Sequence, residues 1–214
     1  MAGLLIVGAG GHGKVVADTA YESGNWEKIA FLDDRYPLLK SLVIWPVLGN
    51  IFQASMFRDE YSNIVVAIGD NALRFELVHR FLGMGFFLPV IIHPTAFVSR
   101  FAHIGLGSVI FAQVATNAGA HIGIGSIVNT GATIDHDCLV GDGVHISPGV
   151  HLAGSVKVGN CSWIGIGSSI LPQICIGENV VVGAGAAITA NIPNDVTVVG
   201  VPGKTIRRHL VFSL

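Results

Sequence analysis

The sequence predicts a small α/β domain with a parallel sheet over residues 1–93, followed by a parallel β-helix of about five coils over residues 94–214 with a short tail. Two observations support this prediction. Residues 96–191 repeat every six positions without a gap for sixteen cycles, and the residues before them alternate aliphatic strands with helical segments. That alternation indicates a parallel sheet covered by helices, whereas a six-residue period is typical of a parallel β-helix.

The elements of the first domain follow one another in a regular order. We expect strands over residues 4–7, 29–32, 64–68 and 87–92, a helix with apolar residues at 15, 16, 20 and 21, and a second helix over residues 73–82. His93-Pro94 marks the boundary with the repeats, because proline restricts its own backbone and that of the residue before it.

The repeats define an inside and an outside. The third position of each hexad is aliphatic in fifteen of sixteen cases, and the first is always Ala, Ser, Cys, Val or Ile, so we expect both to point inward. Three six-residue faces make a coil of 18 residues, and residues 18 apart then stack in columns about 4.8 Å from one coil to the next. The outward positions carry few charges, which predicts that one outer face is buried between subunits.

Composition excludes several classes of partner. Only 12% of residues are charged, the formal net charge is −2 and there is no basic run, so nucleic acid is not expected as a partner. The longest apolar run, residues 81–92, is interrupted and is shorter than the roughly 20 residues of a membrane span. No signal peptide is expected, because the first residues lack a charged region followed by a cleavage site; the three cysteines, an odd number, lie in the repeats. We therefore expect a cytoplasmic protein with reduced cysteines.

A glycine loop joins the first expected strand to the first helix. It reads Gly8-x-Gly10-x-x-Gly13, and Asp33 follows about 20 residues later at the end of the next strand. This Rossmann-like pattern binds diphosphates at a helix N-terminus and a ribose on the acidic residue. Only about 90 residues precede the repeats, which fits a mononucleotide diphosphate better than a dinucleotide. His12 could donate to a phosphate or sugar; the alternatives are a surface histidine and a turn without a ligand.

A second motif stands out among the small outward residues of the repeats. Asp135-His136-Asp137-Cys138 places His136 at the fifth position of its hexad, near a corner and reachable from outside. A carboxylate that contacts an imidazole raises its basicity and fixes its tautomer. His136 is therefore a candidate general base, oriented by Asp137 or Asp135. The alternative is a corner histidine without a catalytic role.

Further histidines occupy the second position of their hexads. His145 could donate to an acyl oxygen, and Trp163 follows one coil later in the same column. Trp163 is interpreted first as a packing residue and second as a cofactor contact. His103 and His121 stack on another face, where a surface or interface position is expected.

Two other chemistries have less support. Cys138 could act as an acyl-accepting nucleophile, but it occupies the inward first position that Ala, Ser and Val fill elsewhere. A metal site built from His136, His145 and carboxylates lacks the ligand spacing that indicates zinc. No metal is therefore expected.

These motifs together resemble a known family. The hexapeptide run, the Gly-Val-Pro-Gly-Lys tail at 200–204 and residues 136–138 resemble the left-handed β-helix acyltransferases. The loop at 10–13, the Asp pair at 33–34 and the segment 67–71 are similar to the acetyltransferases that complete bacillosamine-type nucleotide sugars, together with perosamine N-acetyltransferases and sialic acid O-acetyltransferases. The resemblance spans nearly the whole chain.

The resemblance implies a left-handed β-helix, a homotrimer with active sites between neighbouring β-helices, and acetyl-CoA as the co-substrate. It implies that His136 is the general base and that Asp137, where the family often has Glu, raises its basicity. It also assigns binding residues: Gly10, Gly11, His12, Asp33, Asp34 and Gly69 to the nucleotide sugar, Asn129 to a polar position beside the base, His145 to the acetyl thioester, and Ile166 and Ala184 to the cofactor. The Gly10 position is often Ser in the bacillosamine enzymes.

The expected activity is N-acetylation of a nucleotide-linked 4-amino-4,6-dideoxy sugar, UDP-linked in the first instance, by direct attack of the amine on the thioester. O-acetylation of a sialic acid and N-acetylation of GDP-perosamine stay open within the same fold. A non-catalytic nucleotide-sugar-binding trimer and an NAD-dependent enzyme are alternatives of other classes. Binding of UDP, GDP, CMP or NAD would discriminate among them.

Overall fold

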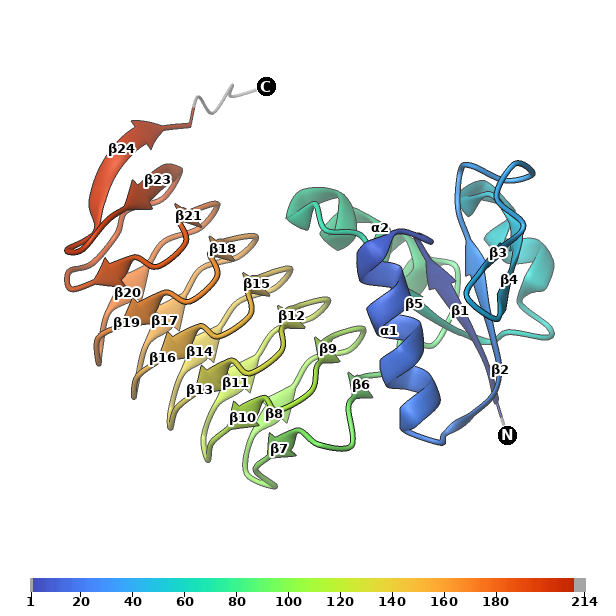
Figure 1. Cartoon of the computed structure of the whole chain (residues 1–214), viewed down its shortest axis with the longest axis horizontal. Helices are drawn as coiled ribbons and strands as arrows, with labels where there is room; N and C mark the ends of the chain where they lie inside the picture. The colour runs from blue at the N-terminus through green and yellow to red at the C-terminus, as the bar shows by residue number, and fades with distance from the viewer. Residues whose placement is uncertain (1, 210–214) are drawn as a thin grey trace.

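The computed structural model describes residues 2–209, and Figure 1 shows an α/β domain beside a β-helix. The first domain runs β1 (Ala2–Val7), α1 (Gly11–Glu22), β2 (Trp26–Leu32), β3 (Ser41–Leu42), β4 (Trp45–Gly49), η1 (Ile51–Phe57), β5 (Asn63–Val66) and α2 (Asn71–Gly83). Its sheet has the order β3-β4-β2-β1-β5, and every pair except β3–β4 is parallel. The predicted helices and the first three predicted strands are confirmed.

Strand β1 is buried on both faces of the sheet. Leu4 and Ile6 pack in the core on the side of α1, whereas Leu5 and Val7 pack in the core on the side of α2. All four are fully buried. Both faces of a parallel sheet are covered in this way, which is why its strands are continuously apolar.

The fourth predicted strand, over residues 87–92, does not form as one continuous strand of the first domain. Phe87 makes a single parallel bridge to Asn63, and Ile91–Ile92 form β6, which pairs with β9 of the β-helix. Pro89 lies between them and cannot donate a ladder hydrogen bond. Strands β3 and β4 and helix η1 were not predicted.

The β-helix has three faces, as the repeat predicts. The domain face, which packs against the first domain, comprises β6 (Ile91–Ile92), β9 (Val109–Ile110), β12 (Ile127–Val128), β15 (His145–Ile146), β18 (Trp163–Ile164), β21 (Val181–Val182), β23 (Val196–Val199) and β24 (Lys204–Arg208). The small-residue face comprises β7 (Phe97–Val98), β10 (Ala115–Thr116), β13 (Thr133–Ile134), β16 (His151–Leu152), β19 (Ser169–Ile170) and β22 (Ala187–Ile188). The histidine face comprises β8 (His103–Ile104), β11 (His121–Ile122), β14 (Leu139–Val140), β17 (Lys157–Val158) and β20 (Cys175–Ile176).

The inward phasing of the hexads is confirmed. First- and third-position side chains such as Val144 and Ile146 form one continuous core, and both are fully buried. Parallel pairing joins residues 18 apart, as between His121 and Leu139. The residues after β6 form the left-handed β-helix that the family resemblance implies.

Two corners of the β-helix matter for function. At the base corner, which includes residues 135–138, the chain passes from the small-residue face to the histidine face. At the groove corner, which includes residues 147–150, 165–168 and 183–186, it passes from the domain face to the small-residue face. The small-residue face therefore lies between these two corners.

The two ends of the β-helix differ. Near the N-terminal end, the outward side chains of Phe111 and Val109 join the core on the α1 side of the first domain. At the other end, β23 continues the domain face and β24 pairs with it in antiparallel fashion. Within residues 2–209, no helix has the length and apolar character needed to cross a membrane.

Candidate active site

The glycine loop contains glycines of two kinds: some are required by the backbone geometry or by close packing, and others have open space around them. Gly8 has a positive φ of 100°, and a side chain on Gly13 would collide with the carbonyl of Gly8. Gly10 and Gly11 have no atom within 4 Å of an added Cβ. Helix α1 begins at Gly11 without a side-chain cap, so its first N–H groups are open to a bound anion.

Asp33 sits at the end of β2, as predicted, but its carboxylate is already engaged. Oδ2 accepts hydrogen bonds from the Ala9 N–H at 2.7 Å and from Arg35 Nη2 at 2.9 Å. Oδ1 accepts from the N–H and from Nε of Arg35. The hydrogen bond with the Arg35 side chain is the main cause that lowers the pKa of Asp33 to about 2. Asp34, by contrast, is exposed, and its carboxylate is the acceptor of one long bond from Ile51 N–H.

His12 and His145 meet where the first domain contacts the β-helix. Their ring centroids lie 6.4 Å apart, and the rings of His12 and Phe111 form a T-shaped pair with centroids 5.6 Å apart. Burial, with the nearby charge of Arg74, lowers the pKa of His12 to about 4 and that of His145 to about 3. Both rings are therefore neutral at pH 7. His12 Nε2 and His145 Nδ1 are buried without a hydrogen-bond partner among the described residues.

Arg74 of α2 is a residue that the sequence analysis missed. Its side chain is buried, with 1% exposure, and no carboxylate accepts from it in the described part of the chain. Its guanidinium instead donates to the carbonyls of Gly125, Gly143, Ile68 and Gly69 and to Asn71 Oδ1. Arg74 thus links the loop after β5 to two turns of the β-helix. Only its place on the buried side of a helix could have indicated this role.

Two cavities adjoin this contact. The first, of about 480 Å³, lies between the start of α2 and the domain face; its lining is Gly69, Asp70, Asn71, Ala72, His145, Cys161, Trp163, Asn179 and Val181. The second, of about 410 Å³, follows the groove corner; its lining is His145, Ser147, Pro148, Trp163, Gly165, Ile166, Val181, Val182, Gly183 and Ala184. The predicted cofactor residues Ile166 and Ala184 therefore share one mostly apolar groove with His145.

Trp163 stands in the wall between the two cavities. Its indole ring stacks on His145 with centroids 5.7 Å apart and an interplanar angle of 1°. The Nε1–H donates to Ser147 Oγ at 2.7 Å, which fixes the ring orientation. The indole therefore lines the same groove as Ile166 and Ala184, and a cofactor contact at Trp163 stays a prediction.

The predicted dyad forms at the base corner. His136 Nδ1 and Asp137 Oδ2 are 2.9 Å apart, and both side chains are more than half exposed. The hydrogen bond with Asp137 is the main cause that raises the pKa of His136, and the charge of Asp135 adds to it. Asp135 accepts instead from Asn117 Nδ2 and from the His136 N–H. Asp137 is therefore the carboxylate that orients the ring.

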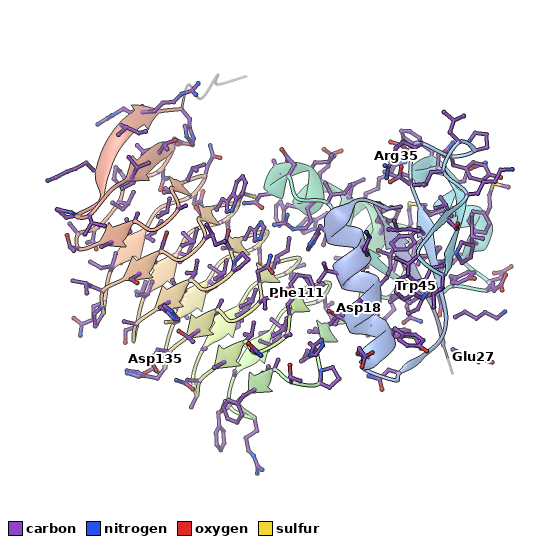
Figure 2. The ribbon with its side chains drawn as sticks, in the orientation of Figure 1. Asp18, Glu27, Arg35, Trp45, Phe111 and Asp135 are labelled. Atoms are coloured by element: carbon purple, nitrogen blue, oxygen red, sulfur yellow. The ribbon has the colours of Figure 1, made fainter. Side chains whose placement is uncertain are left out.

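Within one chain, the dyad does not meet the other predicted residues. Asn129 was expected beside the base, but its Nδ2 lies 3.4 Å from His145 Nε2 on the domain face. Asn129 follows β12 at the groove corner, whereas His136 follows β13 one face later, so the hexad phase separates them. Figure 2 shows Asp135 far from Phe111 and Arg35.

Cys138 and the pair His103–His121 contact other parts of the β-helix. Cys138 is fully buried, its Sγ lies 3.1 Å from the Ala153 carbonyl oxygen, and burial raises the pKa of its thiol. His103 and His121 stack with centroids 4.4 Å apart, as predicted from their column. Among residues 2–209, no group of three or more His, Cys, Asp or Glu side chains is placed to hold a metal ion.

A left-handed β-helix with an acid–histidine dyad at one corner and an apolar groove at another defines a hexapeptide-repeat transferase. Residues 155–190 match the family described as bacterial transferase hexapeptide, six repeats, and residues 3–81 match the PglD N-terminal domain. The acetyltransferase domain of PglB from Neisseria gonorrhoeae FA1090 is 43% identical, with a TM-score of 0.93 over 96% of this chain and 100% of that chain. That domain has also been solved in complex with acetyl coenzyme A.

Two further relatives indicate which kind of acetyltransferase the chain is similar to. PerB from Caulobacter crescentus, solved in complex with CoA and GDP-perosamine, is 38% identical, with a TM-score of 0.91 over 96% of this chain and 97% of that chain. A UDP-N-acetylbacillosamine N-acetyltransferase from Bacillus subtilis (strain 168) is 38% identical over 115 residues. That match covers 52% of this chain and 52%, about half, of the curated relative. The chain belongs to the family of hexapeptide-repeat sugar-nucleotide acetyltransferases.

Proposed function

We propose that this protein transfers the acetyl group of acetyl-CoA to the amine of a nucleotide-linked 4-amino-4,6-dideoxy sugar, with UDP as the nucleotide. The family membership, and the acetyl-CoA bound by the PglB domain, support acetyl-CoA as the acetyl donor. The bacillosamine relative supports UDP, whereas PerB with its GDP-perosamine makes GDP the second candidate. The free cysteines of the described chain are consistent with a cytoplasmic enzyme.

The observation that carries this proposal is the exposed His136–Asp137 dyad at one edge of the small-residue face, with the apolar groove at the other edge. Three chains packed through this face around a threefold axis bring the base corner of each chain to the groove corner of the next. The outward side chains of the face are small apart from Phe97 and His151, which favours close packing. A homotrimer therefore completes three sites, each between two chains.

In that site, the amine attacks the thioester carbonyl directly. The new C–N bond forms, His136 accepts the proton that the amine loses, and the C–S bond breaks to release CoA. Asp137 stabilises the imidazolium that results, because its carboxylate holds Nδ1 at 2.9 Å. Ile166 and Ala184 line the acetyl-CoA groove, with His145 at the end nearer the first domain.

The nucleotide sugar binds along the first domain. The open N–H groups at Gly10 and Gly11 face its diphosphate, and the exposed carboxylate of Asp34 is available to a ribose hydroxyl. The rings of His12 and His145 are neutral. They can form uncharged hydrogen bonds with the sugar where it approaches acetyl-CoA. Gly69, which lines the cavity at the start of α2, leaves room for the sugar.

The substitution His136→Ala tests the assignment of the base. We expect kcat to fall by at least about 100-fold with little change in UDP or acetyl-CoA affinity, because proton transfer supplies a factor of that order. His121→Ala, which removes an exposed imidazole on the histidine face, is the matched control and keeps its activity. A near-normal kcat in His136→Ala would overturn the base assignment.

Ligand binding tests the substrate class separately. Calorimetry with UDP, GDP, CMP and NAD on the purified protein is expected to give the tightest binding for UDP. Binding of GDP instead would assign a perosamine-type substrate, CMP a sialic acid-type substrate, and NAD alone would contradict the proposed function. Light scattering at the same concentrations is expected to give the mass of a trimer.

A further inference from the structure

The guanidinium of Arg35 lies beside the glycine loop, and the protein uses only part of its hydrogen-bonding capacity. Its Nε donates to Asp33 Oδ1 at 2.7 Å, and its Nη2 donates to Asp33 Oδ2 at 2.9 Å and to the Ala9 carbonyl at 2.8 Å. No described residue accepts from Nη1, and the side chain is 58% exposed. The guanidinium is thus held in place by the protein, while the two N–H groups of Nη1 have no acceptor in the described part of the chain.

The same contacts remove Asp33 as a partner for a ligand. A carboxylate has about four lone-pair sites, and Asp33 accepts four hydrogen bonds from Ala9 and Arg35. It has no free acceptor for a ribose hydroxyl. Its charge is already matched by that of Arg35, and the pair orients the arginine rather than a sugar.

We propose that Arg35 binds a phosphate group of the nucleotide and is a specificity-determining residue for nucleoside diphosphates at this loop. The inference rests on the proposed function, because it assigns a new contact within the same nucleotide site. Ala9, whose carbonyl receives the guanidinium, directly precedes Gly10 and Gly11, whose surroundings are open. The fixed cation and the uncapped start of α1 therefore present positive charge to the same ligand.

The physical reason is the pre-organisation of the guanidinium. Arginine matches phosphate oxygens with a planar fork, and Asp33 and Ala9 hold that fork before a ligand arrives. Less side-chain entropy is then lost on binding than for a free surface arginine. Lysine cannot reproduce this arrangement, because its single ammonium would either pair with Asp33 or reach the phosphate.

The test is calorimetric titration of the full chain with UDP, and with CoA as the second ligand. We expect Arg35→Met to weaken UDP binding by about tenfold or more, in line with the loss of charge-assisted hydrogen bonds, and to leave CoA binding unchanged. Arg35→Lys is expected to give a smaller but measurable loss. The UDP affinity of the wild type should fall more steeply with added salt than that of Arg35→Met.

Lys28→Met is the matched control, because Lys28 is also an exposed cation that pairs with a carboxylate, Glu60, and it lies in β2, seven residues before Arg35. Its UDP affinity is expected to equal that of the wild type. Equal UDP affinity in Arg35→Lys, Arg35→Met and the wild type would overturn the inference while leaving the proposed function intact. Failure of the wild type to bind any nucleoside diphosphate would instead overturn the proposed function itself.

Discussion

His136 and Gly154 occupy the same column of the β-helix, and the imidazole ring of the first lies against the backbone of the second. A Cβ on Gly154 would stand 2.5 Å from His136 Nε2 and 2.6 Å from Cε1. One coil earlier, a side chain on Gly119 would collide with the Asp137 carboxylate. Both members of the dyad therefore rest on glycines in neighbouring coils, which leave room for them.

Gly154→Ala tests whether this contact positions the base. The added methyl group displaces the ring of His136, so we expect kcat to fall by about tenfold or more, since geometry controls proton transfer. The free energy of unfolding should change little, because the exposed ring can move into solvent. Gly83→Ala, where an added Cβ meets nothing within 4 Å, is the control. Unchanged kcat in Gly154→Ala would show that the ring position does not depend on Gly154.

Asp137→Asn is expected to move the acid limb of the pH–rate profile to lower pH. The pKa of His136 is raised chiefly by its hydrogen bond to Asp137 and further by Asp135. A general base must be neutral, so activity in the wild type falls as the pH drops through this raised pKa, above the ordinary value of 6.5. Without the Asp137 carboxylate, the acid limb moves to lower pH and the plateau rate decreases. The kcat/KM profile from pH 5 to 9 measures both changes, and an unmoved limb would contradict the assignment.

Cys138→Ala should retain activity within about twofold. The thiol is buried in the β-helix core, and its raised pKa disfavours the thiolate that nucleophilic catalysis needs. Alanine occupies the same hexad position elsewhere in the repeats, for instance at Ala132. Steady-state kinetics would detect the opposite result, an inactive variant with intact fold, which would favour an acyl-enzyme intermediate.

Arg74→Met should destabilise the contact between the two parts of the chain. The substitution leaves several buried carbonyl groups without a donor, so we expect a loss of at least about 2 kcal/mol in the free energy of unfolding. Arg80→Met, on the exposed side of α2 where Arg80 lies over Phe52, should cost about 1 kcal/mol or less. Denaturant unfolding compares the two variants, and equal losses would mean that the Arg74 hydrogen bonds contribute no more than a surface contact.

The sequence predicts the β-helix more completely than the α/β domain, for a physical reason. An unbroken six-residue period determines which side chain faces inward at every position from 96 to 191, and hence that His121 stacks on His103. The same arithmetic places Asn129 and His136 of one chain on different corners, so a position of Asn129 beside the base stays a prediction that requires two neighbouring chains. The segment that forms β3, β4 and η1 has no comparable period, and it was not predicted.

The hydrogen bonds of Arg35 and Arg74 could not be predicted from these patterns. The pairing of Asp33 with Arg35 depends on how the chain turns after β2, and the hydrogen bonds of Arg74 depend on how α2 docks on the β-helix. In the sequence, Arg35 looks like an ordinary solvated cation, and Arg74 differs from one only by its place on the buried side of α2. Periodicity records which face of an element is buried, but not which backbone carbonyl a polar group will reach.

The terminal strand β24 covers the edge of β23 at the C-terminal end of the domain face. A stack of parallel coils ends in unpaired N–H and C=O groups, which could add a strand from another molecule and grow into a fibre. Here the turn at 200–203 bonds to Ala187, and β24 folds back on β23. The new edge carries Lys204, Arg207 and Arg208, so two such edges repel each other electrostatically.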